Sequence, residues 1–415
     1  MSKFIIQGGA KLSGKVKISG AKNSALKLLA ASIMAESPST IHNVPRIKDI
    51  EKIESLIEKT GAKVTIEGNS VTIDPTTINS QSLDKDLSEK IRASVVLAGP
   101  MLSKYGTISF YQPGGCLIGA RKIDDHLDVL GQFDIDIKTE GDKFILSGKP
   151  KAEEIVLPNM SVTATENAIM ASVLSKGKTT IRVAAAEPEI QDLTNYLNSM
   201  GAKINNMGHT VTIEGVDKLN GTEYTTMPDR IEAATYLMMA VATNSEIEID
   251  GVQPEHLSLV LKILKKTGAK FDIVDDKLIT NKRESLKSID INTRTYPGFP
   301  TDLQSVYTVY STQTEGSTRV FETIFESRFG YIEELQKMNA NINVEGPHIV
   351  NISGPDKLTG TSISSTDIRG GAALILAALL AEGTTTIDNI EQIERGYENI
   401  DQKLRKLGVS IEKDI

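Results

Sequence analysis

The 415-residue sequence contains one cysteine, five histidines and few aromatic residues. One cysteine cannot form an internal disulfide, which indicates a reducing compartment and a cytoplasmic protein. Because the histidines are scattered and the cysteine is single, no ligand pair has a usable spacing and we expect no metal site. Aromatic residues make up 5% of the chain and the net charge is −8, so a nucleic-acid-binding repeat protein is disfavoured.

Several common signals are also missing. The first residues, MSKFIIQGGAKLSG, lack the apolar run of a signal peptide, and the most apolar stretch, AALILAALLA, is too short to span a bilayer. We therefore expect no membrane insertion. There is no Gly-x-x-x-x-Gly-Lys-Ser/Thr loop and no Gly-x-Gly-x-x-Gly turn after a strand, so neither common nucleotide-binding device is expected, and we expect no cofactor.

A diverged segment of about seventy residues recurs through the chain. Each copy has an apolar helix, a strand, an amphipathic helix and a hairpin. The apolar helices are predicted to begin near Lys22, Arg92, Thr163, Arg230, Asp302 and Arg369. A second pattern, Gly-x-x-Lys-Leu-x-Gly, occurs at Gly8, Gly215 and Gly354, next to groups of repeats.

The six copies predict two domains of three repeats each. Residues 1–21 and 229–415 are predicted to form a discontinuous domain, which is completed by one N-terminal strand over Lys3 to Lys17. Residues 22–228 are predicted to form an inserted domain. Because the first helix of each copy is apolar on almost all sides, it should be buried, and the second helix should lie outside. We predict an α/β fold, a two-domain inside-out α/β barrel, with the active site in the cleft between the domains.

Basic residues lie at the predicted helix starts, where the helix dipole disfavours cations. Lys22, Arg92, Arg230 and Arg369 could together form a site for a phosphorylated ligand. Alternatively, they pair with neighbouring acids. Asp229 stands one residue before Arg230 and Asp367 stands two residues before Arg369, so these two arginines are the most readily explained as structural.

Cys116 lies in the stretch YQPGGCLIGAR, which is not expected to form regular structure. A thiol on such a loop is better explained by chemistry than by core packing, and Arg121 and Lys122 would lower its pKa. Asp302, in YPGFPTDLQ, begins a predicted buried helix. It is either a functional acid or an N-terminal cap, and its position alone favours the cap.

A set of motifs spread over the whole chain now suggests a family. They are SGAKNSAL, IRAS, PGGCLIGAR, TATENAIM, AEPEI, PDRIE, FPTDLQ, FESRF and ERGYE. Together they resemble the UDP-N-acetylglucosamine enolpyruvyl transferase family. The related 5-enolpyruvylshikimate-3-phosphate synthases share the six-unit fold without the cysteine loop.

The resemblance implies transfer of the enolpyruvyl group of phosphoenolpyruvate to the 3′-hydroxyl of UDP-N-acetylglucosamine, the first committed step of peptidoglycan synthesis. It implies that Cys116 protonates phosphoenolpyruvate or adds to it, and that fosfomycin alkylates this thiol. It implies that Asp302 is a candidate general base, and that Lys22 and Arg395 are also catalytic. The implied substrate-binding residues are Lys22, Asn23, Arg92, Arg121, Lys122, Ile123, Asp124, Asp125, Asp302, Ile324, Arg328, Arg369 and Arg395.

The sequence departs from the family pattern at four positions. Lys122 and Asp125 stand where proline and an apolar residue are more usual, and Ala186 stands where a basic residue is usual. Asn159 stands where some members carry a lysine that reaches the diphosphate. Three alternatives remain open. They are a second-copy paralogue with weak transferase activity, an enolpyruvyl transferase with a different acceptor, and a catalytically idle ligand-sensing or regulatory protein.

Overall fold

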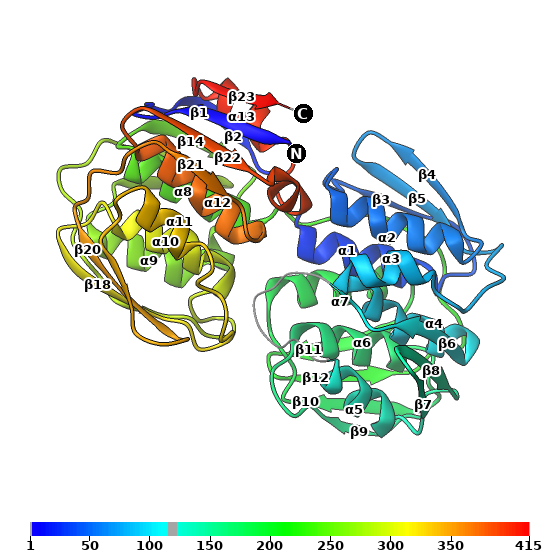
Figure 1. Cartoon of the computed structure of the whole chain (residues 1–415). Coiled ribbons are helices and arrows are strands. Elements are labelled where there is room, and N and C mark those ends of the chain that lie inside the picture. Colours follow the sequence, from blue (N-terminus) through cyan, green and yellow to red (C-terminus); the bar gives the residue numbers. More distant parts are fainter. Residues whose placement is uncertain (1, 115–122, 415) are drawn as a thin grey trace. The chain divides into compact units, whose positions relative to one another are not determined.

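The computed structural model describes residues 2–114 and 123–414, so Cys116, Arg121 and Lys122 lie outside the described residues. The described chain divides into two compact units (Figure 1). Unit 1 contains residues 2–19 and 228–414, and unit 2 contains residues 20–114 and 123–227. The chain passes between the units at 19–20 and 227–228, where the sequence predicted 21–22 and 228–229.

Apolar helices form the centre of unit 2. They are α1 (Lys22–Ser32), η1 (Arg92–Leu97), which runs into α4 (Ala98–Tyr105), and α6 (Val162–Ser172). Their alanine, leucine and isoleucine side chains belong to one hydrophobic core. The outer helices are α2 (Lys48–Lys59), α3 (Lys85–Lys90), α5 (Asp124–Gln132) and α7 (Pro188–Ser199).

Three sheets enclose these helices. The first has the order β13 (Glu223–Thr225), β3 (Ser39–His42), β5 (Ser70–Asp74) and β4 (Lys63–Glu67). The second has β6 (Thr107–Tyr111), β8 (Lys143–Ser147) and β7 (Asp136–Glu140), and the third has β11 (Lys203–Met207), β12 (Thr210–Glu214), β10 (Lys178–Arg182) and β9 (Glu154–Val156). In the β4–β5 hairpin, Gly68 has φ 61° and occupies the two-residue turn, a conformation that glycine adopts without strain.

Unit 1 repeats this plan. Its central helices are α8 (Arg230–Ala242), α12 (Ile368–Leu380) and η3 (Thr301–Leu303), which leads into α10 (Gln304–Ser311). The other helices are η2 (Pro254–Leu257), α9 (Ser258–Thr267), α11 (Ile332–Lys337), η4 (Ile390–Arg395) and α13 (Ile400–Lys406). Asp229 and Asp367 cap α8 and α12, because each carboxylate accepts hydrogen bonds from two backbone N–H groups of the first turn.

The N-terminal segment of unit 1 forms two strands in two different sheets, so the prediction of one strand over residues 3–17 is wrong. The first sheet has the order β21 (Ser362–Ser364), β22 (Thr384–Asp388), β1 (Lys3–Gln7) and β23 (Ile411–Asp414). The second has β15 (Phe271–Val274), β16 (Lys277–Thr280), β14 (Glu246–Asp250) and β2 (Ser13–Lys17). The third has β17 (Ile291–Asn292), β18 (Gly316–Phe321), β20 (Ile349–Gly354) and β19 (Ile342–Val344).

The repeated Gly-x-x-Lys-Leu-x-Gly pattern has a steric explanation. A Cβ atom on Gly8 would lie 2.0 Å from the carbonyl oxygen of Ala381, and one on Gly215 would lie 1.6 Å from that of Ser175. A Cβ atom on Gly354 would lie 2.7 Å from the carbonyl oxygen of Thr314. These close approaches require glycine, so the pattern marks chain packing.

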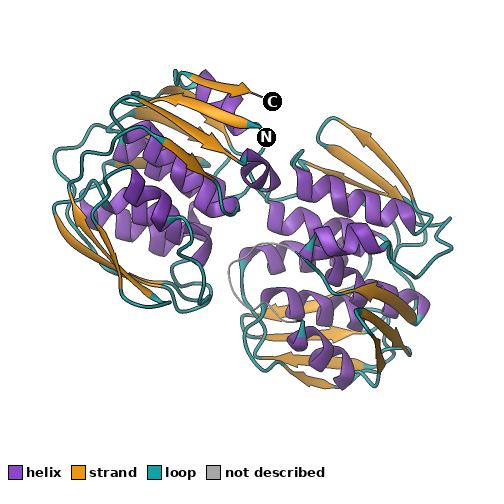
Figure 2. Ribbon diagram, in the orientation of Figure 1, coloured by secondary structure: helices purple, strands orange, loops and turns teal. Residues whose placement is uncertain are grey.

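Within each unit the apolar central helices lie inside and the sheets outside (Figure 2). The predicted inside-out α/β fold is therefore confirmed. Within the described ranges, no helix combines the length and apolarity needed to cross a membrane.

Candidate functional site

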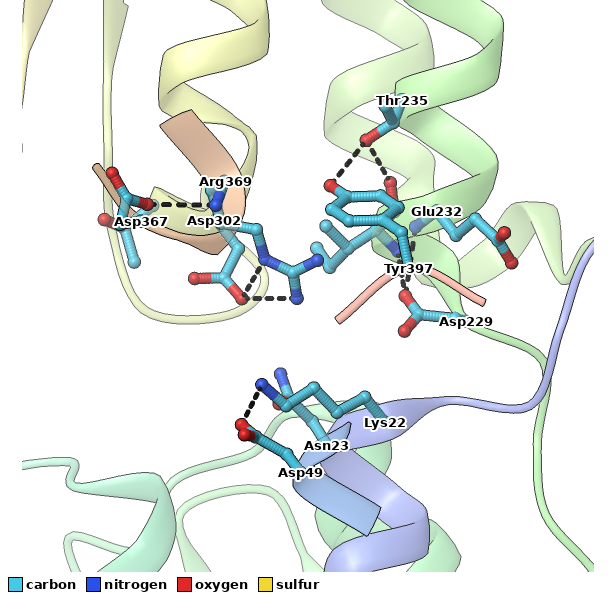
Figure 3. Close-up of polar contacts among 12 residues, drawn as sticks. Lys22, Asn23, Asp49, Asp229, Glu232, Thr235, Asp302, Asp367, Arg369 and Tyr397 are labelled. Atoms are coloured by element: carbon cyan, nitrogen blue, oxygen red, sulfur yellow. Dashed lines mark hydrogen bonds and ion pairs between the residues drawn. The ribbon is translucent and has the colours of Figure 1, made fainter. Parts of the chain in front are cut away.

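In unit 2, Lys22 and Asn23 begin α1. The Lys22 ammonium lies 2.8 Å from the Asp49 carboxylate of α2, and only 9% of the Lys22 side-chain surface is exposed (Figure 3). The prediction missed Asp49, because an acid in the first turn of an amphipathic helix is ordinarily explained by the helix dipole. The start of α1 thus holds a cation that is paired with an acid of α2, and Asn23 follows Lys22 in the sequence.

A second ion pair lies one turn further along α1. Lys27 Nζ donates to the backbone carbonyl of Asn23 at 2.8 Å and lies 3.3 Å from Glu166 Oε2 of α6. Both side chains are buried, and Glu166 is fully so. Burial raises the pKa of Glu166 to about 7, against the opposing charge of Lys27.

The other predicted residues of unit 2 lie on separate elements. Arg92 begins η1 and is partly buried. Ile123 precedes α5 with 2% of its surface exposed, in the hydrophobic core, so any ligand contact there would fall to its backbone. Asp124 and Asp125 open α5, and Asp125 Oδ2 accepts a hydrogen bond from Asn159 Nδ2 at 3.0 Å. Two of the four departures from the family pattern therefore contact each other.

In unit 1, three predicted residues meet, and we call Asp302, Arg328 and Arg369 the Asp302 cluster. Arg328 donates from Nη2 to Asp302 Oδ1 at 2.7 Å. Arg369 donates from Nη2 to Asp302 Oδ2 at 2.9 Å (Figure 3). Both arginines are buried, whereas 26% of the Asp302 side chain is exposed. Burial alone would raise the pKa of Asp302, but the charges of Arg369 and Arg328 hold it well below its usual range.

These contacts decide two alternatives left by the sequence. Asp302 caps no helix, since all of its hydrogen bonds within the described residues come from the two arginines. The cap interpretation is therefore wrong. Arg369 pairs with Asp302 and stacks over the Tyr397 ring at 5.3 Å, while Asp367 caps the helix, so an Arg369–Asp367 pair is also wrong.

The remaining predicted residues of unit 1 lie on other elements. Arg395 ends η4 and donates to Gln392 Oε1 at 3.0 Å. Ile324 is 36% exposed, on the loop after β18. Arg230 lies 5.7 Å from the Tyr296 ring. The described ranges contain no group of three or more His, Cys, Asp or Glu side chains that could hold a metal ion.

Two neighbours of the cluster were missed by the prediction. Thr301 accepts a hydrogen bond from Arg328 and donates one to Glu322. Thr301 stands next to Asp302 in the sequence, and that adjacency was the one available signal. Glu322 carried no signal, because it is distant in sequence and follows an ordinary strand.

Known proteins of one family match this chain over nearly its whole length. A family model described as EPSP synthase (3-phosphoshikimate 1-carboxyvinyltransferase) matches residues 6–404. The UDP-N-acetylglucosamine 1-carboxyvinyltransferase of Halothermothrix orenii is 44% identical, with 100% of both chains covered. UDP-N-acetylglucosamine 1-carboxyvinyltransferase 2 of Geobacillus kaustophilus is 41% identical, covering 99% of this chain and 96% of the relative.

Solved structures give the same result. The enolpyruvyl transferase NikO from Streptomyces tendae superposes with a TM-score of 0.91 at 25% identity, covering 99% of this chain and 98% of that one. EPSP synthase from Acinetobacter baumannii has a TM-score of 0.75 at 17% identity over 100% of both chains, which shows the shared fold. The chain therefore belongs to the EPSP synthase family of carboxyvinyl transferases, together with the UDP-N-acetylglucosamine 1-carboxyvinyltransferases that it resembles from end to end.

Proposed function

We propose that this enzyme transfers the enolpyruvyl group of phosphoenolpyruvate to the 3′-hydroxyl of UDP-N-acetylglucosamine and releases phosphate. The observation that carries the proposal is full-length identity of 41–44% to enzymes named for this acceptor. The product would be the first committed intermediate of peptidoglycan synthesis. We place the reaction in the cytoplasm, in agreement with the single cysteine.

The chemistry needs a proton donor, a proton acceptor and positive charge. The methylene carbon of phosphoenolpyruvate gains a proton, and the sugar oxygen bonds to the adjacent carbon as its own proton leaves. The resulting tetrahedral intermediate then loses phosphate and one proton from the methyl group, which restores the double bond. Cations stabilise the carboxylate and phosphate throughout.

We assign these roles by the family pattern and by geometry. Cys116 is the proposed donor to the methylene carbon. Lys22, Arg121 and Arg395 are proposed to bind phosphoenolpyruvate, with Asn23 orienting the reacting groups. The other proposed binding residues are Arg92, Lys122, Ile123, Asp124, Asp125, Ile324, Arg328 and Arg369.

Asp302 is the proposed acceptor of the sugar hydroxyl proton. Because two arginines keep its pKa low, Asp302 is ionised at neutral pH and accepts a hydrogen bond from a hydroxyl readily. A carboxylate of low pKa is a weak base, so we infer that Asp302 accepts the proton only as the bond from oxygen to carbon forms. Its main work before that step is to orient the hydroxyl.

Product analysis tests the acceptor. Purified enzyme is incubated with phosphoenolpyruvate and either UDP-N-acetylglucosamine or shikimate 3-phosphate, and the products are identified by mass spectrometry. We expect a carboxyvinyl group on the sugar nucleotide alone. Modification of shikimate 3-phosphate alone would assign the chain to the other branch of its family, and modification of neither would favour another acceptor or an idle paralogue.

A further inference from the structure

A buried glutamate organises the chain beside the Asp302 cluster. Glu322 follows β18 and is 0% exposed. Its carboxylate accepts four hydrogen bonds, at 2.8–3.2 Å, from the hydroxyls of Thr293 and Thr301 and from the backbone N–H groups of Ile324 and Phe325. A buried carboxylate with this many donors holds its surroundings in one arrangement. Glu322 thereby fixes both Thr301 and the loop that carries Ile324.

Thr301 connects Glu322 to Arg328 through two hydrogen bonds. Its hydroxyl donates to Glu322 Oε2 at 2.8 Å and accepts from Arg328 Nη1 at 2.8 Å. A hydroxyl has one proton to donate, and Glu322 takes it, so the oxygen lone pairs are left to face the arginine. The hydrogen bonds therefore run in one direction, from Arg328 through Thr301 to Glu322.

Arg328 completes the connection to Asp302. Its second terminal nitrogen donates to Asp302 Oδ1 at 2.7 Å, and its guanidinium carbon lies 5.4 Å from the centre of the Phe325 ring. The planar guanidinium thus has one edge shared between Thr301 and Asp302. If the Thr301 contact were lost, one edge of the guanidinium would have only Asp302 to fix its rotation.

We propose that Thr301 is a positioning residue that sets the Arg328 guanidinium on Asp302 by joining it to Glu322. Thr301 itself touches no reacting atom. The inference rests on the proposed function insofar as Asp302 orients the acceptor hydroxyl. Its structural part, that Thr301 fixes Arg328, stands on the described hydrogen bonds.

Thr301→Val tests this directly, because valine keeps the shape and removes the hydroxyl. Thr301→Ser restores the hydroxyl. Thr318→Val is the matched control, since Thr318 lies on β18 with 0% exposure and its hydroxyl has no hydrogen-bond partner within the described ranges. Thr301→Ala replaces the valine variant if that protein does not fold.

The first readout is independent of activity. The guanidinium N–H signals of Arg328, assigned with Arg328→Lys, are followed by NMR in each variant. We expect separate, slowly exchanging signals in the wild type, Thr301→Ser and Thr318→Val, and averaged signals in Thr301→Val because the guanidinium then rotates. Signals that stay separate in Thr301→Val would overturn the proposal.

The second readout is kinetic. Loss of one hydrogen bond to a charged group predicts that kcat in Thr301→Val falls about tenfold or more, with a smaller change in KM for the sugar nucleotide and with recovery in Thr301→Ser. Averaged NMR signals with an unchanged kcat would overturn the positioning role. If the wild type fails to use UDP-N-acetylglucosamine, the proposed function fails, while the NMR comparison still decides whether Thr301 fixes Arg328.

Discussion

Asp302 shows what a single residue reveals in sequence and what it does not. An aspartate at a predicted helix start is compatible with a cap and with a functional acid, and its position alone favours the cap. Its partners, Arg328 and Arg369, lie 26 and 67 residues away. Only the fold brings these charges together, so the low pKa of Asp302 was not predictable from its neighbours.

Asp302→Asn should impair both turnover and stability. An amide cannot pair with two buried guanidinium groups, so the free energy of unfolding should fall by about 1–3 kcal/mol. Turnover should fall by about 10²–10⁴-fold, the usual contribution of a positioned proton acceptor. Steady-state phosphate release and urea unfolding measure the two effects, with Asp290→Asn as a control whose carboxylate accepts from a backbone N–H.

The contribution of the Asp302 carboxylate to stability should depend on pH in one direction. Because the folded pKa of Asp302 lies below its unfolded value, the stability that the carboxylate contributes is present above about pH 4 and is lost as the pH falls further. The stability difference between wild type and Asp302→Asn should therefore be constant from pH 5 to 8. A difference that grows with pH across this range would contradict the two-arginine account.

At the scale of elements, the sequence predicted the buried helices closely. The expected starts at Lys22, Arg92 and Arg230 are the first residues of α1, η1 and α8. The other three starts are displaced by one residue, which is within the usual uncertainty of helix ends. Apolar residues on all sides of a helix are a strong signal of burial, so these elements needed no long-range information.

The N-terminal segment shows where such prediction stops. The sequence suggested one strand over residues 3–17, but the segment turns at Gly9, which has φ 72°, and supplies strands to two sheets. β1 pairs with β22 and β23, which both lie near the C-terminal end of the chain. Pairing between residues about 380 apart in sequence leaves no local pattern to recognise.

The buried Lys27–Glu166 pair joins α1 and α6, two helices that were predicted to be apolar. This pair should make the stability of the protein depend on pH. The folded pKa of Glu166, about 7, exceeds its ordinary value of 4.5. Its contribution is therefore fully present below about pH 4.5 and is lost as the pH rises through 7. From pH 4.5 to 8, the wild type should lose roughly 3 kcal/mol of stability relative to Glu166→Gln.

Urea unfolding of both proteins at pH 5 and pH 8 measures this difference. Glu153→Gln, at an exposed position, controls for the removal of one negative charge. If the difference between wild type and Glu166→Gln were the same at both pH values, Glu166 would not be protonated near neutrality in the folded protein.

At the scale of the whole molecule, six repeats in two units were visible in the sequence because each repeat had to bury its own apolar helix. The catalytic residues, by contrast, cannot be assigned from a repeated pattern in the sequence. The charged residues that the proposed reaction requires come from both units and from many elements, and spacing along the chain does not say which of them share a substrate. That part of the account depends on family membership and on contacts such as those around Asp302.

The most direct test of the central claim is phosphate release from phosphoenolpyruvate, measured with and without UDP-N-acetylglucosamine. We expect release that depends on the sugar nucleotide. We also expect that release falls by orders of magnitude in Cys116→Ser while the variant still binds that nucleotide. No release from a folded wild-type enzyme that binds the sugar nucleotide, or equal release without it, would contradict the proposed transferase.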